Sequence, residues 1–421
     1  MSYYYSDLHI HSKYSRATSK LLDYTHLTFW GSIKGLNLIG TGDILHKKWQ
    51  EEFSDSLIYD NTTGFYKPNQ KTLKQVQSLH ESVNIQNKNI LDNPPFFIPT
   101  VETSHIYKHN NKVRKIHLVT IFDTLESAKK ISNYLESNDF NLHSDGRPIL
   151  GLPVKSYLQI LLERLDSSQF ILMPAHIWTP WFSLLGAKSG YNSISEAFED
   201  LSSYITVVET GLSSDPKMNR HIAELDTTLL LSNSDAHSPQ KLAREANIHI
   251  KLNNINTLFN TFKTQKNFYG TIEFYPEEGK YYYSGHRKCN IAINPLQNKQ
   301  LTHCPVCKKP LTKGVLHRVS ELSTRTKPNK KLLDKFPTIY SIPLVTLLSK
   351  TYKKGESSKT IQQKYFETIN TLGPEINILH NININSIANY DKLLATTIQK
   401  LRNHKIKVTP GYDGIFGQIS I

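Results

Sequence analysis

Cysteine and long hydrophobic runs are both scarce in this chain. Three Cys among 421 residues cannot build a disulfide framework, so a reducing cytoplasm is the expected location. No stretch approaches the roughly 20 apolar residues of a membrane span. No N-terminal segment combines a basic head, an apolar middle and a small-residue cleavage site. The sequence therefore predicts a cytoplasmic protein with no membrane partner.

Acidic residues are scarce in one half only. Residues 1–250 hold 24 Lys+Arg and 26 Asp+Glu, whereas residues 251–421 hold 26 and 10, a balance of +16. Because the phosphates of nucleic acid attract clustered Lys and Arg, this segregation favours a polyanionic partner, with nucleic acid as the first candidate. The alternative is that the additional Lys residues only solvate a surface.

Short apolar runs in the first 250 residues end repeatedly in His or a carboxylate. A parallel strand that is buried on both faces has this pattern, and α/β folds bind ligands at the C-terminal ends of such strands. Segments with helical spacing alternate with the runs, which favours a barrel or a doubly wound sheet. They cover residues 73–90, 124–135, 155–165 and 194–204. Residues 50–70 lack periodicity and are predicted to form a loop or lid.

The residues at these strand ends are suited to metal binding. His9 and His11 are two apart, so on a strand both rings project from one face, and Asp235 with His237 repeats the spacing. Glu102 has two oxygens and can bridge two ions. Single buried His residues are more often structural, but two such pairs together favour a divalent metal centre. The candidate metal ligands are His9, His11, Asp43, Glu102, His117, His176, Asp235 and His237.

The three Cys residues lie in a second, separate pattern. His286-x2-Cys289 and Cys304-x2-Cys307, with fourteen residues between them, have the spacing of a structural zinc site. His286 fits best as the fourth ligand, with His303 and His317 as alternatives, and buried free thiols are the alternative to zinc. Arg287 and Lys288 lie within this pattern, and basic residues around it are typical of a knuckle that contacts phosphates.

Longer strings make the chain recognisable. DLHIHS with the later SNSDAHS resembles the polymerase and histidinol phosphatase (PHP) superfamily. The strings GTGDILHKKW, PAHIWTPWFSLLGAKSG, ETGLSSDPKMNR, SNSDAHSPQKLAREAN, GHRKC, CPVC, GVLHRVSEL and PGYDGIFG are similar to the endonuclease Q family of DNA repair nucleases. The resemblance extends over nearly the whole chain. It departs at SKYSRATSK, which lacks the third His of many relatives, and at Asp43, which is followed by Ile44 instead of His.

The resemblance implies an α/β fold with several parts. We expect a distorted (βα)7 PHP barrel over residues 1–250, a connecting segment over 251–280, and a zinc-binding module over 281–325. A basic α+β DNA-binding domain would follow over 326–421. The barrel would bind two or three divalent ions (Zn, Mn or Mg), with two the safer expectation, and the module would bind one structural zinc.

The resemblance also implies an activity. The enzyme would nick one strand of duplex DNA 5′ to uracil, hypoxanthine, xanthine or an abasic site, with water activated by the ions. Asp235 and Glu102 would hold the ions, and His176 or His117 would help a proton leave. A sliding clamp is a second candidate partner, although no docking peptide is recognisable.

Lesion recognition requires an aromatic wall and polar groups that read the edge of the extruded base. Trp178 and Trp181 follow His176 closely and would form either such a wall or a plug of the barrel. The candidate DNA-contacting residues are Ser12, Lys13, Tyr14, Trp178, Trp181, Ser213, Ser214, Arg287 and Lys288. Two other functions stay open. One is a PHP-type phosphatase for a small phosphomonoester, which would not need the zinc module, and the other is a non-enzymatic DNA-binding protein.

Overall fold

The computed structural model describes residues 3–298 and 300–421. Its main sheet has eight strands in the order β16-β13-β12-β1-β2-β5-β4-β3. Strand β1 is parallel to β2, which is parallel to β5, while β12, β3 and β4 add antiparallel pairs. The strands are β1 (Tyr4–Asp7), β2 (Leu38–Gly40), β3 (Leu57–Tyr59), β4 (Tyr66–Pro68), β5 (Phe96–Ile98), β12 (Ala246–His249), β13 (Phe268–Phe274) and β16 (Thr338–Ser341).

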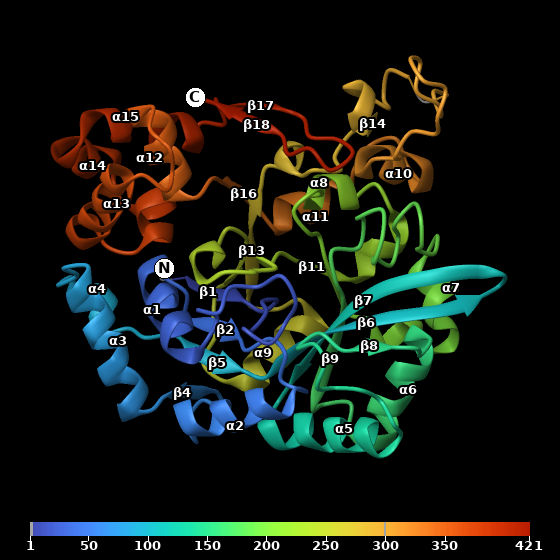
Figure 1. Cartoon of the computed structure of the whole chain (residues 1–421), viewed down its shortest axis with the longest axis horizontal. Helices are drawn as coiled ribbons and strands as arrows, with labels where there is room; N and C mark the ends of the chain where they lie inside the picture. The colour runs from blue at the N-terminus through green and yellow to red at the C-terminus, as the bar shows by residue number, and fades with distance from the viewer. Residues whose placement is uncertain (1–2, 299) are drawn as a thin grey trace.

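Two smaller sheets complete the framework of the first 250 residues. Four strands run in the order β8-β6-β7-β9, and β10 pairs with β11. Strands β6 and β7 form a long antiparallel hairpin that projects from the body at the right of Figure 1. The strands are β6 (Thr100–His109), β7 (Lys112–Phe122), β8 (Ile149–Leu150), β9 (Phe170–Pro174), β10 (Val207–Glu209) and β11 (Leu229–Leu231).

The α/β class is confirmed, but the sheets of the described residues do not close into a barrel. Between β5 and β6 stands Pro99, which has no N–H to donate to a ladder. Isolated hydrogen bonds replace continuous ladders at other junctions. The N–H of Ile177 donates to Glu209 O at 3.1 Å, and that of His11 donates to Ala236 O at 3.2 Å. The strand ends are nevertheless brought to one region.

Helices lie between these strands. They are α1 (Tyr24–Lys34), α2 (Lys47–Ser56), α3 (Gln70–Ser82), α4 (Lys88–Leu91), α5 (Leu125–Ser137), α6 (Val154–Arg164), α7 (Ile194–Phe198), α8 (Pro216–Asn219) and α9 (Ile255–Thr264). Each of the four predicted helical segments overlaps one or two of them. The prediction of a loop at 50–70 is wrong, because α2 extends to Ser56 and the β3–β4 hairpin follows. Trp49 and Phe53 are buried and four residues apart, a helical pair that begins before residue 50.

The segment after residue 250 combines a small knuckle with a helical group. Near the Cys residues lie β14 (Ser284–His286), β15 (Ile291–Ile293) and α10 (Val315–Leu322), followed by α11 (Lys330–Lys335). The helical group is α12 (Leu344–Tyr352), α13 (Lys359–Leu372), α14 (Ile384–Tyr390) and α15 (Lys392–Arg402), with the π-helical turn η6 (Asn377–Asn381). A closing hairpin, β17 (Lys407–Thr409) and β18 (Gln418–Ser420), runs between the helical group and the knuckle (Figure 1).

Strands β13 and β16 lie beyond residue 250 but belong to the main sheet. The later segment is therefore joined to the first by backbone ladders, and the domain boundaries stay a prediction. No helix among the described residues is both long enough and apolar enough to cross a membrane.

Candidate functional site

One group of possible ligands gathers His9, His11 and Asp235. The two His residues follow β1 and Asp235 follows β11. Asp235 Oδ1 lies 3.0 Å from His11 Nε2 and 3.7 Å from His9 Nε2. One ligand atom from each residue lies within 4.8 Å of the other two, close enough for all three to hold one ion.

A second group gathers Glu102, His117 and His176 in the same way. Glu102 Oε1 lies 2.6 Å from His117 Nδ1 and 3.2 Å from His176 Nε2. The same carboxylate also lies 3.5 Å from His9 Nε2 and 3.5 Å from His11 Nε2. Glu102 thus stands between the two groups, as a bridging ligand would.

His9 provides a test of whether these residues fit a cation. Its Nε2 is buried and has no hydrogen-bond partner among the described residues, although Glu102 and Asp235 are nearby. A buried polar atom without a partner is costly and requires an explanation. Imidazole nitrogens and carboxylate oxygens are suitable ligands for Zn²⁺ and related divalent ions. The residues fit such an ion.

The electrostatics of the cluster agree with this fit. Burial alone lowers the pKa of His9, but the carboxylates of Glu209 and Glu102 outweigh it and hold that pKa well above its ordinary value. Burial alone raises the pKa of Glu102, but His117 and His9 hold it well below the usual range. The buried carboxylate of Glu102 therefore favours its ionised form and attracts positive charge.

Asp43 and His237 belong to neither group. Asp43 Oδ2 accepts hydrogen bonds from Ser12 N at 2.7 Å, Ser12 Oγ at 2.6 Å and Ser15 Oγ at 2.8 Å. Its Oδ1 lies 3.5 Å from His11 Nδ1, the ring nitrogen away from Asp235. This position favours orientation of His11 over direct ligation. The His237 ring lies 4.5 Å from the His11 ring, and its Nδ1 is 2.9 Å from Asp235 O.

Sequence reasoning missed Glu209 and Arg147. Glu209 Oε2 lies 2.9 Å from His9 Nδ1 and accepts from the N–H of His176 at 2.7 Å, so it orients residues of both groups. Its position at the end of β10 was the available signal. Arg147 Nη1 donates to Glu102 Oε2 at 3.1 Å, from a loop without any periodic pattern.

Several predicted DNA-contacting residues already have partners within the chain, and their contacts with DNA stay a prediction. Ser12 is buried and both its donors are used by Asp43, so it is not free to hold a phosphate. Lys13 Nζ lies 2.9 Å from Glu52 Oε2, and Tyr14 donates to Glu52 Oε1 at 2.5 Å. Ser214 is also buried and donates to Thr210 O at 2.8 Å.

The two tryptophans have different environments. Trp178 is 1% exposed and donates from Nε1 to Asn219 Oδ1 at 2.7 Å, so it is a core residue and presents no face to a base. Ser213 is buried too, against Gly279. Trp181 is 38% exposed, with its ring 5.8 Å from that of Tyr281, and stays a candidate wall.

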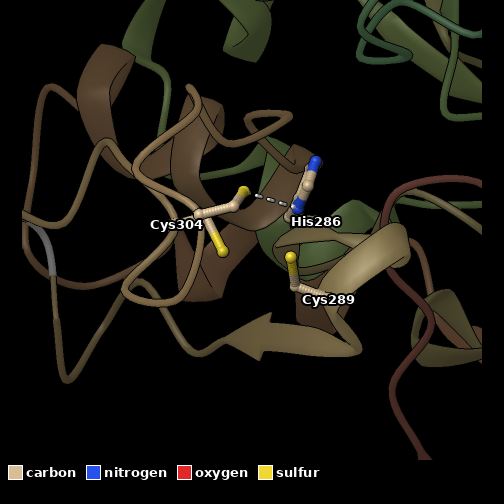
Figure 2. Close-up of side chains that lie close together, drawn as sticks. His286, Cys289 and Cys304 are labelled. Atoms are coloured by element: carbon tan, nitrogen blue, oxygen red, sulfur yellow. Dashed lines mark hydrogen bonds between the residues drawn. The ribbon is translucent and has the colours of Figure 1, made fainter.

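The Cys residues gather as their spacing predicts. Ligand atoms of His286, Cys289, Cys304 and Cys307 lie within 4.8 Å of one another, and Figure 2 shows the first three side chains converging. Cys307 Sγ lies 3.5 Å from His286 Nδ1, which favours His286 as fourth ligand. The alternatives stand apart from the group: His303 Nδ1 is 3.0 Å from Thr302 Oγ1, and His317 Nδ1 is 3.2 Å from Ser284 Oγ. Arg287 and Lys288 are exposed beside this site.

Comparison with known sequences identifies relatives. The MJ0043 C-terminal domain family matches residues 343–405. The uncharacterized protein MJ0043 of Methanocaldococcus jannaschii is 33% identical over 272 residues, which are 62% of this chain and 33% of that protein. The chain thus spans about a third of that relative. The uncharacterized protein YqxK of Bacillus subtilis is 28% identical over 309 residues, 72% of this chain and 73% of that protein.

Two solved structures match over the full length. The lesion-specific endonuclease PfuEndoQ from Pyrococcus furiosus has a TM-score of 0.83 and 29% identity, covering 100% of this chain and 96% of that one. An endonuclease Q complex with a 27-mer duplex substrate, with an abasic lesion at its active site, has a TM-score of 0.82 and 29% identity, covering 100% and 97%. These structures confirm that the chain is a relative of endonuclease Q over its whole length.

Proposed function

We propose that this chain is a metal-dependent DNA repair endonuclease that nicks one strand of a duplex 5′ to a lesion. The lesions proposed are uracil, hypoxanthine, xanthine and abasic sites. The observation that carries the proposal is the match, over the whole chain, to an endonuclease Q bound to a duplex with an abasic lesion. The convergence of two groups of metal-binding residues supports it independently.

The chemistry would take place between these two groups. His9, His11 and Asp235 would hold one divalent ion, and Glu102, His117 and His176 another. Bound divalent ions supply activated water and stabilise charge on the leaving oxygen. The protein supplies the rest: Glu209 holds the ring of His9 and the backbone of His176, and Asp43 lies 3.5 Å from His11 Nδ1. Because His176 would be a ligand of the second ion, the proton taken up by the leaving oxygen would come from water.

DNA binding is assigned to the basic later segment. Residues 251–421 carry the balance of +16, and contacts from such residues to phosphates position a duplex without reading its sequence. Arg287 and Lys288 are exposed beside the zinc-ligand group and would contribute to this surface. Trp181, the exposed tryptophan nearest to His176 in sequence, is proposed to stack on the extruded base.

The test is a gel assay with matched labelled duplexes. Each carries one uracil, hypoxanthine, xanthine or abasic site, and an undamaged duplex and a chelator arm are the controls. We expect a nick 5′ to the lesion that requires added Mn²⁺ or Mg²⁺ and is absent with Asp235→Asn. Hydrolysis of small phosphomonoesters without any nick would favour a phosphatase. Lesion-duplex binding with no hydrolysis of either substrate would favour a non-enzymatic binder.

A further inference from the structure

The loop that carries Arg147 is built tightly against the metal-ligand cluster. A Cβ on Gly146 would lie 2.2 Å from Asp43 Oδ2 and 2.9 Å from Ser15 Oγ, so only glycine lets this backbone approach the buried carboxylate. The N–H of Gly146 donates to Tyr14 O at 3.0 Å, and Ser104 N donates to Pro148 O at 2.9 Å. The backbone is therefore fixed on both sides of Arg147.

The guanidinium of Arg147 is placed beside the ligand that joins the two groups. Nη1 donates to Glu102 Oε2 at 3.1 Å, and the side chain is 25% exposed. A guanidinium has five N–H donors. Within the described part of the chain, Glu102 is the acceptor found for it, which leaves most of its donors for a ligand.

The chemistry of that ligand follows from charge. A fixed positive charge beside metal ligands repels the cations that these ligands would hold. Its electrostatic effect is most favourable when an anion lies between it and those cations. The guanidinium fork matches the paired oxygens of a phosphate. The proposed function brings a phosphodiester, the scissile one, to this cluster.

We propose that Arg147 binds a non-bridging oxygen of the scissile phosphodiester and stabilises the charge that develops there as the bond to the leaving oxygen breaks. This inference rests on the proposed function. It names a group of the protein, in addition to any ion, that acts on the reacting phosphate.

Asp145 connects Arg147 to a second arginine, Arg16, which lies nearer the surface. Its Oδ1 accepts from the backbone N–H of Arg16 at 3.2 Å and of Arg147 at 3.1 Å, and its Oδ2 lies 3.5 Å from Arg16 Nε. One carboxylate thus ties the two arginines together. The Arg16 side chain is 72% exposed, and the geometry assigns it to a phosphate next to the scissile one.

The experiment compares Arg147→Ala, Arg147→Lys and Arg16→Ala on a duplex with one abasic site. The control is Arg164→Ala, an exposed arginine on α6 that stacks on Tyr134. For Arg147→Ala we expect kcat to fall about 10²–10³-fold with KM nearly unchanged. Added guanidinium should restore part of that rate, and Arg147→Lys should lose at least about tenfold because it lacks the fork. Arg16→Ala should raise KM and weaken its salt dependence, with kcat nearly unchanged.

Measuring the metal content and the thermal unfolding of each variant distinguishes a lost catalytic contact from lost metal binding or lost folding. The proposal is overturned if Arg147→Ala keeps the wild-type kcat, or if its loss comes with lost metal and no rescue by guanidinium. If Arg147→Ala does not fold, a wild-type kcat for Arg147→Lys overturns it equally. A wild-type protein that nicks no lesion duplex would instead contradict the proposed function itself.

Discussion

At the scale of the residue, three polar positions of the cluster have left-handed backbone. Asp43, His176 and Asp235 have φ of 51°, 30° and 46°. Such conformations cost on the order of 1–3 kcal/mol for residues with a Cβ and persist where the surroundings impose them. Here hydrogen bonds impose two of them: the N–H of His176 donates to Glu209, and Asp43 accepts from Ser12. The backbone at these strand ends therefore lowers the stability of the fold while it places the side chains of the cluster.

Glu209→Gln tests the role of the carboxylate behind His9. The amide keeps the volume but removes the charge that faces His9 Nδ1 at 2.9 Å. Because such outer partners typically change metal affinity 10–100-fold, we expect a loss of about that size. Competition with a chromophoric chelator measures it, and Glu163→Gln, exposed on α6, is the control. Equal affinity in both variants would exclude the role.

His249→Gln tests a buried histidine outside the cluster. His249 Nε2 lies 2.9 Å from Ser6 Oγ, and burial lowers the pKa of His249 to about 3. The unfolded chain takes up this proton near pH 6.5, whereas the folded chain does not. As the pH is lowered from 6.5 toward 3, this histidine therefore reduces the free energy of unfolding of the wild type by up to about 1.4 kcal/mol per pH unit. Urea unfolding from pH 7 to 4.5 should show the wild type losing stability faster than the variant. Parallel pH profiles would contradict this.

Residue-level prediction succeeded where a strand end is visible in the sequence. His9, His11, Glu102, His117 and His176 lie after or on apolar runs, and the structure brings their side chains together. Their roles as ligands stay a proposal. The environments of two others were not predictable, because they depend on packing between distant segments. Arg147 meets Glu102 across a sequence separation of 45 residues, and Ser12 is turned inward by Asp43.

At the scale of the element, the helices with clear apolar periodicity and a capping residue were predicted well. Helix α5 begins after Thr124, whose side chain accepts from Ser127 N, and its buried face repeats at helical spacing. The β3–β4 hairpin was missed because its strands have three residues each and show no alternation. A barrel was predicted, but the sheets of the described residues do not close into one. Apolar runs alone do not reveal that β6 and β7 pair antiparallel.

The group of His286, Cys289, Cys304 and Cys307 is predicted to bind zinc, and its fourth ligand can be tested. His286→Gln should remove one nitrogen ligand and lower the zinc retained after dialysis by about one equivalent, because structural sites use four ligands. His303→Gln is the matched control and should retain it. Metal analysis by mass spectrometry measures both. Loss of zinc from the control alone would reassign the fourth ligand.

At the scale of the whole molecule, a buried ion pair joins α1 to the C-terminal helical group. Lys34 Nζ lies 2.5 Å from Glu375 Oε2, and both side chains are buried. Tyr365 donates to the same oxygen at 2.5 Å, and the N–H of Leu344 donates to Oε1 at 3.0 Å. Each partner satisfies the other at the junction of segments that are far apart in the sequence.

Glu375→Gln should therefore loosen the junction. It leaves the Lys34 ammonium buried without its counter-charge, which typically costs about 3–5 kcal/mol. We expect a lower thermal midpoint and earlier proteolysis between the helical group and the rest. Glu367→Gln, an exposed position on α13, is the control. A midpoint equal to that of the control would show that the pair contributes nothing.

The most direct test of the metal centre is anomalous diffraction from crystals soaked in Mn²⁺. We predict peaks within bonding distance of His9, His11 and Asp235 and of Glu102, His117 and His176, and we expect both to be lost in crystals of the double variant His9→Ala, Glu102→Gln. Peaks confined to His286 and the three cysteines, or no peaks at all in active crystals, would contradict it.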